Sequence, residues 1–178
     1  MSSLVRSYLF DREVSDSRMS IVKKTLGLAM FRPATRLEDT EHATDLVPCI
    51  KIDQLAVRVR NYNAKNYAGE ITMRCGRTAT PITELQKIFS GNATHMFYGI
   101  MNYNNDSFYW WVLVDLNRFR SIIRENPLLL NEFNIIPNRD GQSSFMVIPL
   151  KLISECVVHS SRYLESIVKG YALEAACP

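Results

Sequence analysis

The stretch EDTEHATDLVPCIKIDQLAVRVRNYNAKNYAGEITMRCGR, residues 38–77, decides the predicted fold. It contains three runs rich in apolar and β-branched residues, separated by polar or turn-forming residues, which is the pattern of β-strands. The three predicted strands are residues 46–52, 55–62 and 67–75. Asp53-Gln54, between the first two strands, suits a hairpin turn. These two strands are therefore predicted to pair antiparallel.

Helical patterns flank the predicted strands. Apolar residues recur at helical spacing over residues 14–30, and Pro33 ends that helix because proline cannot donate within one. After the strands, Thr80-Pro81 suits a helix start, and the apolar stripe of the helix consists of Ile82, Leu85 and Phe89. Further strands are predicted at residues 96–102, 108–115 and 145–150, and further helices at 117–125 and 155–176. The sequence thus predicts an α/β fold that ends in a C-terminal helix.

Length and composition favour one domain. A chain of 178 residues with 47% apolar residues can build one sizeable core, predicted to span residues 14–150, with a helical extension at 151–178. No apolar run is long enough to cross a membrane, and charged residues interrupt the start of the chain where a signal peptide would be apolar. We therefore expect a soluble cytoplasmic protein without a membrane partner. The four cysteines show no CxxC pair, so reduced structural thiols are expected.

Basic residues concentrate in the second half of the quoted stretch. The net charge is only +3, but five cations lie within twenty residues, with tyrosines between them. Such clustering is typical of a surface that contacts phosphates. The candidate nucleic-acid-binding residues are Arg58, Arg60, Lys65, Arg74 and Arg77. A solvated strand face with charged edges is the alternative interpretation.

The order of elements resembles the core of the PD-(D/E)XK nuclease superfamily, which includes restriction endonucleases and Holliday-junction resolvases. Thr44-Asp45-Leu46-Val47, followed by Ala56-Val57-Arg58, is similar to the signature aspartate and the acidic-x-lysine triplet of that family. The resemblance covers residues 38–150. It implies a restriction-endonuclease-like α-β-β-β-α-β core, in which helices flank a mixed sheet.

The resemblance also implies a reaction. These enzymes hydrolyse phosphodiesters with Mg²⁺ held by carboxylates, while a lysine orients the attacking water. Two residues separated by one position on a strand point the same way, so the triplet brings a metal ligand and a cation together. Here Ala56 stands at the acidic position and Arg58 at the lysine position. The site has therefore lost one ligand, and arginine suits phosphate contacts better than it suits orienting one water.

A second register retains more of the motif. It takes Asp53 as the signature aspartate and Glu70-Ile71-Thr72 as the triplet, with Arg74 as the cation. The two registers can also combine, with Glu70 completing a site formed by Asp45 and Arg58. The resemblance thus implies that Asp45, Glu70, Arg58 and Arg74 are catalytic. The implied ligands of Mg²⁺ are Asp45, Asp53 and Glu70.

Two classes of function follow. The first is a nucleic-acid-cleaving or nucleic-acid-binding protein, with DNA as the expected partner. It is either a Mg²⁺-dependent endonuclease or a degenerate domain that binds through Arg58, Arg60 and Arg74. The second is an inactive nuclease-derived scaffold, encoded by a phage or mobile element, that binds another protein. Ala56 favours the versions that do not cut, while Asp45 and Glu70 favour the one that does. The resemblance is also compatible with a homodimer, in which two sites act on two strands.

Overall fold

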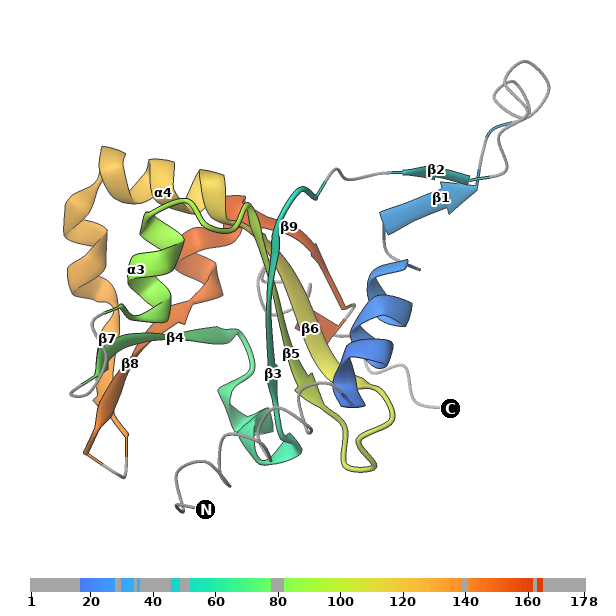
Figure 1. The fold of residues 1–178 in the computed structure, drawn as a ribbon, viewed down its shortest axis with the longest axis horizontal. Helices are drawn as coiled ribbons and strands as arrows, with labels where there is room; N and C mark the ends of the chain where they lie inside the picture. The colour runs from blue at the N-terminus through green and yellow to red at the C-terminus, as the bar shows by residue number, and fades with distance from the viewer. Residues whose placement is uncertain are drawn as a thin grey trace. The chain divides into compact units, whose positions relative to one another are not determined.

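The computed structural model describes residues 17–27, 30–33, 35, 46–48, 52–77, 82–138, 141–161 and 163–164. The chain divides into two compact units, residues 1–51 and 52–178 (Figure 1). In the first unit, residues 17–27 are helical, as predicted, and Val22 and Leu26 are buried. Strand β1 (Phe31–Pro33) pairs antiparallel with β2 (Leu46–Pro48) in the same unit.

The second unit contains two sheets. The four-stranded sheet has the order β3-β5-β6-β9, and its strands are β3 (Leu55–Arg60), β5 (His95–Met101), β6 (Phe108–Asp115) and β9 (Val157–Ser160). This sheet is mixed, because β3 and β5 run parallel whereas β6 is antiparallel to both of its neighbours. The antiparallel three-stranded sheet has the order β4-β8-β7, and its strands are β4 (Glu70–Arg77), β8 (Ser143–Pro149) and β7 (Asn134–Pro137).

Helices flank the two sheets (Figure 1). The α-helices of the second unit are α3 (Glu84–Phe89) and α4 (Leu116–Glu125), and the 3₁₀ helices are η1 (Tyr62–Tyr67), η2 (Pro127–Glu132) and η3 (Leu150–Cys156). Both α-helices have side-chain caps, which satisfy backbone N–H groups of the first turn. Thr83 and Gln86 form a capping box on α3, and Asp115 accepts from two backbone N–H groups of α4. Across the described ranges, no helix is long and apolar enough to cross a membrane.

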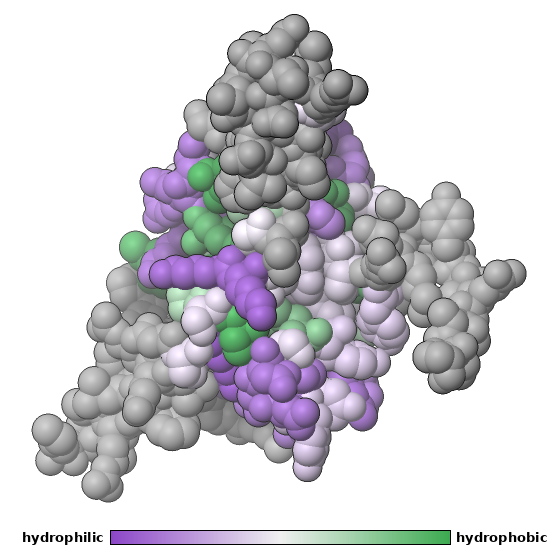
Figure 2. All heavy atoms as spheres, turned by 90° about the vertical axis from the view of Figure 1, so that its right-hand side faces the viewer, coloured by the Kyte–Doolittle hydropathy of each residue, from purple (hydrophilic) through white to green (hydrophobic). Residues whose placement is uncertain are grey.

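One apolar core joins the two sheets and the helices of the second unit. Ile71 and Met73 of β4, Trp110 of β6 and Phe119 of α4 are all fully buried in it. The buried Arg120 of α4 adds polar contacts, because its guanidinium donates to the backbone carbonyls of Ile88 in α3 and of Ala93 in the loop before β5. On the face drawn in Figure 2, the described hydrophobic residues form small patches among hydrophilic ones, which is ordinary for a folded surface.

The α/β class and the mixed sheet are confirmed, but the predicted hairpin is wrong. Strand β2 pairs with β1, and β3 pairs in parallel with β5. The supposed turn residue Gln54 instead connects the starts of β3 and β5, because its carbonyl accepts from the backbone N–H groups of Thr94 and His95 at 3.0 and 3.1 Å. The second and third predicted strands also belong to different sheets, so they do not form one continuous meander.

Two helix predictions also need correction. The C-terminal helix was predicted from residue 155, but residues Val157–Ser160 form β9 and pair with β6, as suits the β-branched Val157 and Val158. The rest of that predicted helix, from residue 165 onward, lies outside the described residues. Helix α3 is capped by Thr83, and Ile82 is 57% exposed, so Ile82 does not belong to the apolar stripe.

The two described cysteines, Cys75 and Cys156, are not disulfide-bonded. Cys156 is fully buried in the core, and burial raises the pKa of its thiol to about 12. A thiol with that pKa is almost entirely protonated at neutral pH and is a poor nucleophile. Cys156 therefore acts as a core residue.

Replacing Gly99 by alanine is expected to destabilise the fold by about 1–3 kcal/mol, because the added methyl group overpacks the sheet. A Cβ at position 99 would lie 2.7 Å from two ring carbons of Phe108 and 3.0 Å from the ring of the fully buried Phe97. Urea unfolding measures the loss. Gly27→Ala is the control, since a Cβ there has nothing within 4 Å and alanine favours helix. Equal unfolding midpoints for Gly99→Ala and the natural chain would contradict the expected overpacking.

Candidate nucleic-acid interface

Three arginines from two strands gather around one aromatic ring. Their Cζ atoms lie 5.2 Å (Arg58), 5.8 Å (Arg60) and 5.5 Å (Arg74) from the ring centroid of Phe145. These are cation–π distances, at which the ring face attracts a guanidinium. Phe145 lies on β8 as the register partner of Arg74. We call Arg58, Arg60 and Arg74 around Phe145 the arginine cluster.

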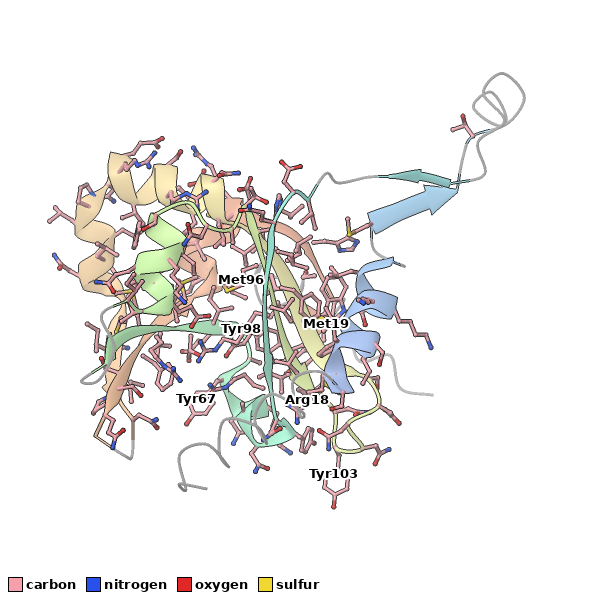
Figure 3. The ribbon with its side chains drawn as sticks, in the orientation of Figure 1. Arg18, Met19, Tyr67, Met96, Tyr98 and Tyr103 are labelled. Atoms are coloured by element: carbon pink, nitrogen blue, oxygen red, sulfur yellow. The ribbon has the colours of Figure 1, made fainter. Side chains whose placement is uncertain are left out.

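The arginine cluster forms because a face of β4 meets a face of the four-stranded sheet. Arg58 on β3 is in register with Tyr98 on β5, and the Tyr98 hydroxyl lies 3.2 Å from that of Thr72 on β4. Tyr98 is buried where β4 approaches the four-stranded sheet (Figure 3). Side chains alternate along a strand, so Thr72 and Arg74 share this face of β4 while Ile71 and Met73 enter the core.

Glu84, the first residue of α3, connects the two arginine-bearing strands. Its carboxylate pairs with the Arg58 guanidinium, and it accepts the backbone N–H of Arg74 at 3.0 Å. The Arg58 and Glu84 side chains are 15% and 28% exposed, so the pair is accessible at its edge. Burial lowers the pKa of Arg58, with Arg60 and Arg74 acting in the same direction, while Glu84 and Tyr98 oppose the shift. Arginine nevertheless stays charged at any physiological pH.

The arginine cluster has unused capacity to bind an anion. Each guanidinium carries five N–H donors, and among the described residues Arg58 pairs with one carboxylate, that of Glu84. In the part of the chain that the structure describes, Nε of Arg74 is buried without a hydrogen-bond partner. An unpaired buried donor is costly, so the hydrogen-bonding groups of Arg74 are not all satisfied within the described residues.

A second cluster lies two residues beyond the end of β3. Tyr62 of η1 makes edge-to-face contacts with Tyr103 and Tyr109, with ring centroids 5.8 and 5.9 Å apart. Lys65 donates to the Tyr62 hydroxyl at 3.0 Å, and this hydrogen bond raises the pKa of Lys65. Tyr109 also packs on Tyr163, at 5.1 Å between centroids. We call Tyr62, Tyr103, Tyr109 and Tyr163 the tyrosine cluster.

The predicted nucleic-acid-binding residues divide into three groups. The arginine cluster unites Arg58, Arg60 and Arg74, whereas Lys65 contacts the tyrosine cluster. The side chain of Arg77 lies outside what the structure describes. The basic stretch of the sequence therefore becomes one compact cationic site with an aromatic neighbour.

Of the three predicted metal ligands, the structure describes Asp53 and Glu70. Asp45 lies outside the described residues. Asp53 lies in the bend before β3, five positions before Arg58. Glu70 begins β4 on the same face as Thr72 and Arg74. Over the described ranges, no group of three or more His, Cys, Asp or Glu side chains could hold a metal ion.

Three residues of the site were missed from the sequence. Glu84 was noted only as part of a helix, and Tyr98 and Phe145 only as strand residues. The strand alternation predicts that Tyr98 and Phe145 each lie on one face, but it does not say which strand lies opposite. Comparisons of this chain with protein-family models, curated proteins and solved structures found no match.

Proposed function

We propose that this chain binds nucleic acid and that the arginine cluster contacts the phosphate backbone. The observation that carries the proposal is the convergence of Arg58, Arg60 and Arg74 on Phe145, with Glu84 as the paired carboxylate. The planar guanidinium fork matches two phosphate oxygens at once. All three arginines are partly exposed, so a phosphate can reach them without unfolding of the site.

In this proposal the chain is a PD-(D/E)XK-like domain, and the face that is catalytic in that family serves here to bind nucleic acid. The parallel pair of β3 and β5, with α3 in the connection between them, supports this relationship. Arg58 stands at the lysine position of the first register, and its planar guanidinium suits a phosphate contact better than orienting a water.

Mg²⁺-dependent cleavage is the second candidate. It is favoured by Glu70, which shares a face of β4 with Arg74, as an acidic ligand and a cation would in the nuclease motif. In this case Asp45, Asp53 and Glu70 would supply carboxylate oxygens, which Mg²⁺ prefers. The ion would provide an activated water for phosphodiester hydrolysis.

Binding is expected to depend steeply on salt. Fluorescence polarisation with labelled duplex, branched and single-stranded DNA and with RNA, between about 50 and 200 mM salt, measures this dependence. Each phosphate contact should contribute a slope of about −0.9 on duplex or −0.7 on single strands in log K against log salt. Arg124→Gln, an exposed arginine on α4, is the control and should bind like the natural chain. Binding that does not change with salt would reject the proposal.

Incubating the same substrates with Mg²⁺ or Mn²⁺ separates the two candidates. We expect the natural chain to bind these substrates without cleaving them. Asp45→Ala should bind with the same affinity and should likewise not cleave. Metal-dependent cutting that disappears in both Asp45→Ala and Glu70→Ala would instead establish the endonuclease.

A further inference from the structure

The turn between β5 and β6 is held together by its own polar groups. The Asn102 side chain donates to Asp106 at 2.7 Å and to Ser107 at 2.8 Å, and its carbonyl accepts the backbone N–H of Asp106. Backbone bonds from Asn102 to Ser107 and from Asn105 to Asn102 close the turn. These bonds give the turn one conformation without help from the side chain of residue 103.

This rigid turn presents Tyr103 to solvent. The Tyr103 side chain is 80% exposed, and it projects outward from the turn (Figure 3). Its edge-to-face contact with Tyr62 favours this direction, because two aromatic rings at this distance attract each other. The turn does not need the tyrosine, yet the tyrosine is exposed and pre-oriented. A large aromatic ring in that state is suited to bind another flat ring.

We propose that Tyr103 and the tyrosine cluster stack on unpaired bases of a strand whose phosphates bind the arginine cluster. This inference rests on the proposed function and specifies its ligand as a single strand or an unpaired segment. Arg60 ends β3, and Tyr62 follows two residues later, so the phosphate-binding and base-binding groups are neighbours along the chain. Lys65, 4.5 Å from the centre of the Tyr62 ring, adds a cation beside the tyrosine cluster.

The geometry favours unpaired bases because only they offer a free face. In a duplex, each base face is covered by its neighbours, and an aromatic side chain must open the stack to reach it. Stacking on an aromatic ring tolerates any base, so little sequence preference is expected. Duplex DNA would then use the arginine cluster alone and bind more weakly.

A cycle of substitutions in protein and ligand tests the stacking directly. The ligands are a labelled oligonucleotide of about 15 nucleotides and an abasic oligonucleotide with the same phosphates, in DNA and RNA forms. For the natural chain, removing the bases should weaken binding roughly ten- to a hundredfold, the range for lost stacking. For Tyr103→Ala, most of the difference in affinity between the intact and the abasic strand should disappear. For Tyr103→Phe, that difference should remain. Leu128→Ala, another exposed large side chain, should bind like the natural chain.

The outcomes also separate this inference from the function on which it rests. Salt-dependent binding that is equal for intact and abasic strands would overturn the stacking and leave the arginine-cluster proposal standing. Failure to bind any nucleic acid in a salt-dependent way would reject both. Unchanged urea unfolding of Tyr103→Ala would confirm that its loss of affinity is not a loss of fold. Equal behaviour of the DNA and RNA strands would mean that stacking does not distinguish the sugar.

Discussion

The double variant Arg60→Gln with Arg74→Gln is expected to bind single-stranded DNA at least roughly a hundredfold more weakly than the natural chain. Each charged hydrogen bond to phosphate contributes about 1.5–3 kcal/mol, and two are removed. The slope of log K against log salt should become shallower by about 1.4, which is two phosphate contacts on a single strand. Arg58 stays in place, because its ion pair with Glu84 also supports the fold.

A matched control separates this local effect from net charge. Arg124→Gln with Lys151→Gln removes two exposed cations from α4 and η3 and changes the net charge equally. It should weaken binding only slightly. Equal losses in both double variants would mean that the chain attracts nucleic acid through its overall charge and not through the arginine cluster.

The double variant Arg60→Gln with Arg74→Gln should have a free energy of unfolding that is nearly unchanged or higher than that of the natural chain. Arg58, Arg60 and Arg74 lie close enough for their charges to oppose one another, and Arg60 and Arg74 both help to lower the pKa of Arg58. Arg74 also has the buried Nε without a partner among the described residues, which glutamine would remove. A loss of affinity without a loss of stability is the result expected when the substituted residues belong to a binding site.

Much of the local structure could be predicted from the sequence. Strands β5, β6 and β8 and helix α4 lie where periodicity placed them, because each has a continuous apolar run or a clear helical stripe. Strand partners could not be predicted in the same way. Gln54 looked like a turn residue, but its bonds reach Thr94 and His95, forty residues along the chain. Periodicity reports which face of a strand is buried and not which strand lies beside it.

The same limit applies to the candidate site: the face on which each residue lies follows from strand alternation, but its partners on other elements do not. Alternation along a strand places Arg58 with Arg60 on one face of β3 and Thr72 with Arg74 on one face of β4, and the contacts of these side chains agree. The residue that joins these faces, Glu84, is twenty-six positions from Arg58. Packing of α3 against β4 brings that carboxylate to the arginines. The position of Asp45, on which the metal site depends, lies outside the described residues.

Glu84→Gln is expected to have opposite effects on stability and on binding. Stability should fall by about 1–2 kcal/mol. A fully buried ion pair would lose about 3–5 kcal/mol, but both partners here are partly exposed and solvent screens their charges. Glutamine can still accept the backbone N–H of Arg74, so the substitution removes mainly the charge. The urea unfolding midpoint measures this loss.

Affinity for nucleic acid should rise about five- to tenfold in the same variant at low salt, because a carboxylate no longer competes with phosphate for Arg58. Glu155→Gln is the matched control, since it breaks an exposed ion pair with Arg118 and should change neither quantity much. A variant that is less stable and also binds more weakly would show that Glu84 positions the arginines and that its charge does not compete with the ligand. A folding defect alone lowers affinity and a change of net charge alone would act equally in Glu155→Gln, so lower stability together with tighter binding in Glu84→Gln but not in the control would identify the arginine cluster as the site where the anion binds.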